Sequence, residues 1–145
     1  MPAAEAQFNE VVLLLVDDDD VDAMGIRRAL DRLRIANPYV RARDGIEALE
    51  MLRDGRVKRP YLILLDINMP RMNGIEMLEA LRNDPELANS VVFVLTTSQD
   101  DQERMAAYRN NIAGYIVKGR TADGFIEVVT MLDHYWKVVD LPVSS

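Results

Sequence analysis

Polar residues follow directly after four apolar runs of this 145-residue chain. Carboxylates come after two of the runs, a hydroxyl after the third and an amine after the fourth. The runs are 11–16, 61–65, 91–95 and 114–117, and the residues that follow them are Asp17 and Asp18, Asp66, Thr96, and Lys118. Acids, a hydroxyl and an ammonium group of this kind, if they meet in space, can bind a cation and an anionic group side by side.

Three neighbouring carboxylates repel one another and resist full ionisation unless a cation joins them. A site made only of oxygen ligands suits Mg²⁺ rather than zinc. We therefore expect Asp17 and Asp18 to hold Mg²⁺ directly or through water, with one oxygen from Asp66 and another from the backbone carbonyl of Asn68. The second oxygen of Asp66 is then a nucleophile that can accept a phosphoryl group as an acyl phosphate. Lys118 would balance the charge of the transferred oxygens, and Thr96 would hydrogen-bond to them.

Each of these residues also has a simpler explanation. Asp66 alone can be a turn residue after a strand. Within the acidic run 17–20, Asp19 or Asp20 can cap the following helix, and the other acids can be solvated charges favoured by the helix dipole. The only histidine, His134, lies late in the last predicted helix, where we expect a surface or interface residue rather than a catalytic one.

The elements around these residues favour the site. The apolar runs are too short for helices and are typical of strands buried on both faces. Together with a weaker strand at 39–42, they alternate with five helical patterns, for which we expect caps at Asn73 and at Ser98 or Asp101, and a last helix from Thr121 to about Val139. This order predicts a doubly wound parallel α/β sheet. Since the carboxyl ends of parallel strands share one edge, the five polar residues should converge there.

The composition of the chain limits the kinds of partner and location that we expect. With 49% hydrophobic and 28% charged residues, we expect one globular domain at 11–140 between short tails at 1–10 and 141–145. The net charge of -7 and the lack of a run of Lys and Arg argue against nucleic acid. The longest apolar run is too short to span a membrane, and no signal peptide is expected. The absence of cysteine is compatible with a reducing cytosol, and we expect a cytoplasmic protein.

Over residues 11–139 the chain is similar to the receiver domains of two-component response regulators. The resemblance is carried by LLVDDD at 14–19, LLDINMPRMNG at 64–74, VLTTS at 94–98 and GYIVK at 114–118. It implies a flavodoxin-like sheet in the order 2-1-3-4-5 with five helices, and a histidine kinase as phosphoryl donor. It also implies site roles: Asp66 as phosphoacceptor, Asp17 and Asp18 as metal ligands, Thr96 and Tyr115 as switch residues, Lys118 as phosphate contact, and Asn68 and Ser98 as positions that tune the lifetime of the acyl phosphate.

The residue after Lys118 departs from the receiver pattern. Receivers usually have proline after the lysine, often with a cis peptide bond, whereas this chain has Gly119. Because cis bonds without proline are costly, we expect the loop after Lys118 to take a different path. Tyr115 also has a plain alternative as a half-buried strand aromatic.

The last predicted helix carries apolar residues on two faces. One face is typical of core, and the second predicts a partner, because large exposed apolar patches are uncommon on monomers. We expect a stand-alone receiver that forms a homodimer or docks through this helix, and its interface residues are Phe125, Met131, Tyr135, Trp136 and Val138. The closing sequence WKVVDLP resembles the tails of single-domain regulators that are paired with phytochrome-type histidine kinases.

We therefore expect a phosphoacceptor signalling protein and not an enzyme with external turnover. Two other classes stay open. A pseudo-receiver would bind partners without phosphorylation, although the complete set of site residues speaks against it. An aspartyl-phosphate phosphohydrolase would share the nucleophile, but many of these enzymes have a second Asp two residues later as acid and base, where this chain has Asn68.

Overall fold

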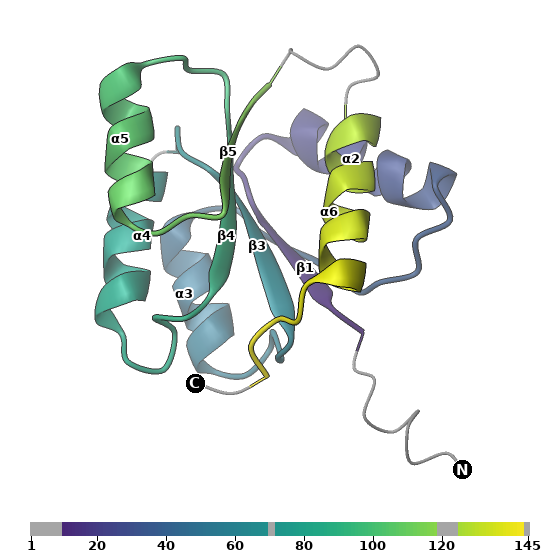
Figure 1. Ribbon diagram of the computed structural model, residues 1–145, viewed down its shortest axis with the longest axis horizontal. Helices are drawn as coiled ribbons and strands as arrows, with labels where there is room; N and C mark the ends of the chain where they lie inside the picture. Colours follow the sequence, from purple (N-terminus) through teal and green to yellow (C-terminus); the bar gives the residue numbers. More distant parts are fainter. Residues whose placement is uncertain (1–9, 70–71, 119–124, 144–145) are drawn as a thin grey trace.

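The computed structural model describes residues 10–69, 72–118 and 125–143. Within these ranges the chain forms one parallel sheet of five strands in the order β2-β1-β3-β4-β5, as expected (Figure 1). The strands are β1 (Val12–Val16), β2 (Tyr39–Ala42), β3 (Tyr61–Asp66), β4 (Val91–Thr96) and β5 (Gly114–Val117). The helices are α2 (Asp20–Arg32), α3 (Gly45–Arg53), α4 (Gly74–Asn83), α5 (Asp101–Arg109) and α6 (Ile126–Val138).

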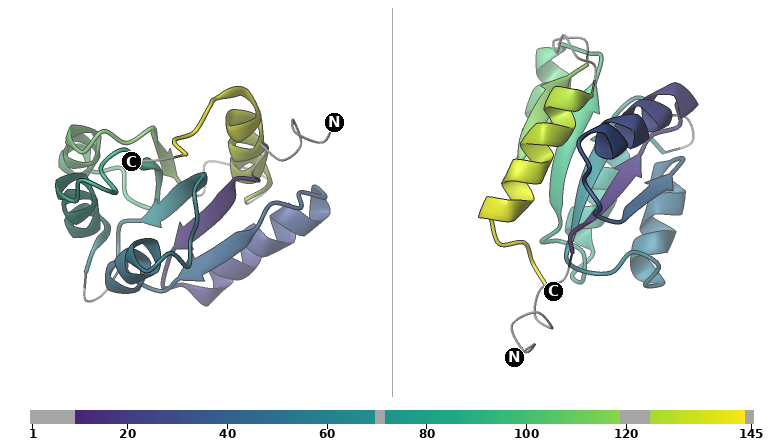
Figure 2. Two further views of the ribbon diagram at one scale, coloured as in Figure 1. Left: turned by 90° about the horizontal axis from the view of Figure 1, so that it is seen from below. Right: turned by 90° about the vertical axis from the view of Figure 1, so that its right-hand side faces the viewer.

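The helices cover the sheet in two layers, with α3, α4 and α5 on one face and α2 and α6 on the other (Figures 1 and 2). Successive strand side chains point to opposite faces: Leu14 and Val16 pack toward α3 and α4, whereas Leu13 and Leu15 pack toward α2 and α6. All six residues of β3 are buried, because this central strand is covered on both sides. Asp66, the polar residue that ends β3, is therefore held in place by the packing of this strand.

Short polar side chains begin most of the helices. Asp19 caps α2, Asp44 caps α3, and Asn73 forms a capping box with Glu76 at the start of α4. The expected cap of α5 was wrong: Asp100 accepts from the N–H of Gln102, so neither Ser98 nor Asp101 is the cap. Helix α6 begins at Ile126 without a side-chain cap, and Thr121 lies outside the described residues.

Helix α6 is less apolar on its outer side than expected. Trp136 is buried against the sheet, and Phe125 and Tyr135 are half-buried against the same core. The rings of Tyr135 and Phe93 meet edge-on, with 5.0 Å between their centroids. Of the five residues expected at an interface, only Met131 (36% exposed) and Val138 (67%) face outward. The apolar rings belong to the core because α6 is the layer that closes this face of the sheet. No helix in the described ranges is long and apolar enough to cross a bilayer.

Candidate functional site

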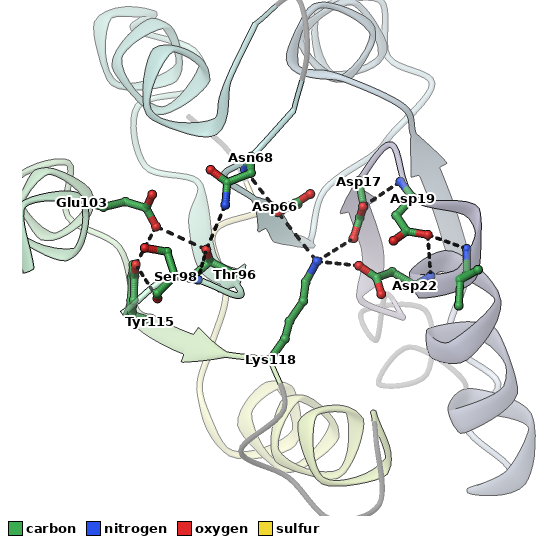
Figure 3. A network of polar contacts seen from close by, with 11 residues as sticks. Asp17, Asp19, Asp22, Asp66, Asn68, Thr96, Ser98, Glu103, Tyr115 and Lys118 are labelled. Atoms are coloured by element: carbon green, nitrogen blue, oxygen red, sulfur yellow. Dashed lines mark hydrogen bonds and ion pairs between the residues drawn. The ribbon is translucent and has the colours of Figure 1, made fainter. Parts of the chain in front are cut away.

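Three carboxylates meet at the carboxyl edge of the sheet, as the strand order requires. One oxygen from each of Asp17, Asp18 and Asp66 can be chosen so that all three lie within 4.8 Å of one another. Asp17 and Asp66 are buried at the ends of the neighbouring strands β1 and β3, and Asp18 is exposed (Figure 3 shows Asp17 and Asp66). The site is open on the side of Asp18 and closed underneath by the apolar sheet.

A tight turn holds Asp66 in place. The N–H of Asn68 donates to Asp66 Oδ1 at 3.3 Å, and the N–H of Gly74 donates to the carbonyl of Ile67 at 2.9 Å. Gly74 is required here, because a Cβ at this position would lie 2.7 Å from Ile67 Cα and 2.9 Å from the Asp66 carbonyl oxygen. The start of α4 therefore packs directly on the backbone that carries Asp66.

Asp17 has the electrostatics of a cation ligand. Its Oδ1 accepts the N–H of Asp19 at 2.9 Å, whereas its buried Oδ2 accepts no hydrogen bond from the residues that the structure describes. The pKa of Asp17 is raised to about 7, mainly by burial and further by the nearby charge of Asp66, while the N–H of Asp19 opposes the rise. A buried oxygen without a donor beside two further carboxylates fits a divalent cation, and so the residues present fit Mg²⁺.

The pKa of Asp66 is also raised, mainly by burial, while the ammonium of Lys118 and the N–H of Asn68 lower it. Lys118 comes from the end of β5 and reaches the acids across the edge (Figure 3). Its Nζ lies 3.8 Å from Asp66 Oδ1 and 3.8 Å from Asp17 Oδ2. Gly119, which follows it, lies outside the described residues.

An acid that the sequence analysis did not single out makes the shortest contact with Lys118. Asp22 Oδ2, in the first turn of α2, lies 2.5 Å from Lys118 Nζ. Burial opposes the charge of Lys118, but the hydrogen bond to Asp22 and the charges of Asp66 and Asp17 together raise its pKa. The signal available in sequence was an extra acid in the first turn of a helix that starts at this edge, which also has the ordinary explanation of dipole stabilisation.

A second group of polar contacts surrounds Thr96 at the end of β4. Its Oγ1 accepts the N–H of Ser98 at 3.1 Å and the side-chain amide of Asn68 at 3.5 Å. The Thr96 hydroxyl donates to Glu103 Oε1 at 3.2 Å, and the hydroxyl of Tyr115 donates to the same oxygen at 2.7 Å (Figure 3). Glu103, on α5, is the second residue that sequence reasoning missed, because nothing in its spacing separates it from a solvated helix acid.

The structure thus brings together the residues predicted from sequence at this edge: Asp17, Asp18, Asp66, Asn68, Thr96, Ser98, Tyr115 and Lys118. Tyr115 is half-buried, and its hydroxyl points toward the Thr96 group rather than only packing in the sheet. The metal role of the Asn68 carbonyl stays a prediction. Asp20 has a different role from the acid pair, since it forms an ion pair with Arg41 at 2.6 Å.

Comparison with known proteins agrees with this geometry. The family model of the response regulator receiver domain matches residues 13–130. Response regulator Rcp1 of Synechocystis sp. is 32% identical over 138 residues, covering 92% of this chain and 94% of its own length. The probable methanogenesis regulatory protein FilR2 of Methanothrix harundinacea is 34% identical over 128 residues, with coverage of 86% and 83%.

Two solved structures are similar throughout. The Mn²⁺-bound form of Rcp1 has a TM-score of 0.80 at 31% identity and covers 91% of this chain and 99% of its own. The phosphorylated cyanobacterial phytochrome response regulator RcpA has a TM-score of 0.83 at 31% identity, with coverage of 92% and 99%. The fold, the acidic edge and these relatives agree, and the chain belongs to the family of response regulator receiver domains.

Proposed function

We propose that this receiver accepts a phosphoryl group on Asp66 from a histidine kinase in a Mg²⁺-dependent reaction and signals through a changed protein-interaction surface. The observation that carries the proposal is the surroundings of Asp66. Its buried carboxylate lies within reach of an acid pair on one side and 3.8 Å from the Lys118 ammonium on another. Acidic residues, a lysine and a hydroxyl in this arrangement serve phosphoryl transfer by positioning and charge balance.

In the proposed reaction an oxygen of Asp66 attacks the phosphorus of a phosphohistidine. The phosphorus–oxygen bond forms as the phosphorus–nitrogen bond breaks, and the leaving imidazole nitrogen takes up a proton. Lys118 faces the oxygens of the transferred group. A Mg²⁺ ion held by Asp17, Asp18, Asp66 and the Asn68 carbonyl would neutralise further negative charge on those oxygens.

The product is an acyl phosphate that carries close to two negative charges. In the sheet, Asp66 of β3 pairs with Leu95 of β4, and Thr96 is the next residue along β4. The Thr96 hydroxyl can therefore turn to the phosphoryl oxygens, and Tyr115 follows the change in its surroundings. The result is a shift in population at the face formed by β4, β5, α5 and α6.

The similarity to RcpA supports a phytochrome-like kinase as the donor. We also propose a homodimer through α6. The exposed Met131 and Val138 support a contact there, and the buried Trp136 and half-buried Phe125 and Tyr135 would shape it from beneath. The acidic net charge of -7 supports a protein rather than a nucleic acid as the target.

Intact-mass spectrometry after incubation with phosphoramidate and Mg²⁺ tests the proposal. We expect one phosphate adduct on the wild-type protein, and none after Asp66→Asn or with EDTA. Asp31→Asn is the matched control, because it makes the same change at an exposed position of α2. A wild-type protein that neither forms the adduct nor binds Mg²⁺ would instead be a pseudo-receiver, with its function in partner binding.

The phosphohydrolase alternative makes a different prediction. Asn68 carries an amide in the position where such an enzyme needs an acid and base. Its side-chain amide donates to Thr96, and its backbone N–H donates to Asp66. We expect no rapid multiple turnover of a phosphate ester. Release of many equivalents of phosphate per protein, lost in Asp66→Asn, would reverse this conclusion.

A further inference from the structure

One carboxylate oxygen joins the two switch residues to helix α5. Glu103 Oε1 accepts the Tyr115 hydroxyl at 2.7 Å and the Thr96 hydroxyl at 3.2 Å (Figure 3). Glu103 lies in the first turn of α5, and both hydroxyls come from the sheet, at β4 and β5. Two donors use the two lone pairs of this oxygen, and so Glu103 holds the start of α5 against the strand ends.

The hydrogen-bonding capacity of Thr96 is full in this arrangement. A hydroxyl has one proton to donate and two lone pairs that accept. The lone pairs of Thr96 Oγ1 receive the N–H of Ser98 and the amide of Asn68, and its proton goes to Glu103. A phosphoryl oxygen can only accept. Thr96 must therefore withdraw its proton from Glu103 before it can bind a phosphoryl group.

We propose that Glu103 is a positioning residue of the phosphorylation site, which competes with the phosphoryl group on Asp66 for the single proton of Thr96. The inference rests on the proposed function. Phosphorylation breaks one of the two hydrogen bonds that join Glu103 to the sheet and places a new anion near its carboxylate. Both effects loosen the attachment of α5, so that the chemical state of Asp66 is transmitted to this helix.

The packing of α5 makes it the element that responds. Of its nine residues only Ala107 is buried, whereas each of the other four helices buries four. Its outer side exposes Met105 (54%) and Tyr108 (49%). A helix with so little buried apolar surface depends on its polar contacts for its position. Releasing Thr96 from Glu103 removes one of them and changes the surface that carries Met105 and Tyr108.

Tyr115 stays with Glu103 when Thr96 leaves. Burial and the Glu103 carboxylate raise the pKa of Tyr115 to about 12, which keeps its hydroxyl protonated and donating at neutral pH. Its other acceptor, the Ser98 carbonyl, lies farther away at 3.3 Å. We therefore expect Tyr115 and the start of α5 to move together.

The test uses beryllofluoride with Mg²⁺ as a stable analogue of the phosphoryl group, titrated into the full chain and followed by amide NMR. Glu103→Gln keeps the size of the side chain but removes the charge that strengthens its hydrogen bond with Thr96. Because charge-assisted bonds are roughly twice as strong as neutral ones, we expect the dissociation constant to fall about fivefold. Asp101→Asn is the matched control, since it removes one charge from the first turn of the same helix while Asp101 pairs with Arg104.

A purely structural role is separated by a double-mutant cycle. In a Thr96→Ala background there is no proton to compete for, and Glu103→Gln should then change the affinity no more than Asp101→Asn does. If Glu103→Gln and Asp101→Asn give the same affinity in the wild-type background, Glu103 does not compete with the phosphoryl group. If the wild-type protein shows no Asp66-dependent binding of beryllofluoride, the proposed function itself fails.

Discussion

Lys118 pairs more closely with Asp22 than with Asp66. Its Nζ lies 2.5 Å from Asp22 Oδ2 and 3.8 Å from Asp66 Oδ1, so that helix α2 holds the ammonium group closer to its own acid than to Asp66. In the proposed reaction, a phosphoryl group on Asp66 would therefore have to draw the Lys118 ammonium away from Asp22.

The first prediction concerns this pair. Asp22→Asn removes the charge that holds Lys118, and the ammonium is then free to move toward Asp66. The charge-assisted hydrogen bond between Lys118 and Asp22 stabilises the starting state but not the transition state. Its loss should therefore lower the barrier, and we expect the initial rate of phosphorylation by phosphoramidate to rise about three- to tenfold. Intact-mass time courses measure this rate, with Asp31→Asn in the same helix as control. A slower reaction together with weaker Mg²⁺ binding would show instead that Asp22 serves the metal site.

The second prediction follows from the shifted pKa of Asp17. Its value rises from 3.8 to about 7 in the folded protein, mainly through burial, so that the folded state binds more protons than the unfolded state between these values. The Tm of the protein in EDTA should therefore fall as the pH rises from about 4 to about 7. Mg²⁺ binds the deprotonated carboxylates, and the stabilisation that it confers should grow over the same window.

Thermal melts in EDTA and in saturating Mg²⁺ across this pH range measure both effects. Asp17→Asn is the informative variant, because a neutral side chain has no proton to lose. It should raise the Tm at neutral pH without metal and abolish most of the gain from Mg²⁺. If Mg²⁺ stabilises the variant and the wild type equally, Asp17 is not a ligand of the ion.

The third prediction concerns the turn that carries Asp66. Gly74→Ala places a Cβ 2.7 Å from Ile67 Cα, and backbone atoms in a buried turn cannot move aside without cost. We expect a loss of about 1–3 kcal/mol in the free energy of unfolding, as for other overpacked sites. Urea denaturation measures it.

Gly25→Ala is the control for this substitution. The new Cβ there meets the ring of Phe125, a side chain that can rotate, and alanine is favoured over glycine inside α2. The loss should therefore be smaller than at Gly74. An unchanged urea midpoint for Gly74→Ala would mean that the turn adjusts freely and does not hold Asp66 in place.

The fourth prediction tests the proposed dimer. Met131 and Val138 are the exposed apolar residues of α6, and a charge placed there would be buried without a partner in a dimer. The double variant Met131→Glu, Val138→Glu should shift the mass measured by light scattering from dimer to monomer. Thr130→Glu, at another exposed position of the same helix, should leave the mass unchanged. A wild-type protein that is already monomeric at high concentration would exclude this dimer.

The strands and the residues directly after them were predictable from sequence. The apolar runs before Asp17, Asp66 and Thr96 are short, continuous and buried on both faces, a pattern that few other structures produce. Once the strands are parallel, their ends must share an edge, and so these residues meet without any further information. The cap of α4 was predictable for a similar reason, and that of α2 was narrowed to Asp19 or Asp20, since a cap is a contact between residues three or fewer apart.

Contacts that depend on how the layers pack were decided only by the tertiary structure. Asp22 and Glu103 lie on helices, and whether such an acid faces Lys118 or Thr96 or the solvent depends on the rotation and placement of its helix against the sheet. Trp136 shows the same limit, because its apolar stripe fits either a core or an interface, and only the closure of the sheet by α6 buries it. Sequence spacing determines what lies at the end of a strand, whereas long-range packing determines which helix side chain reaches it.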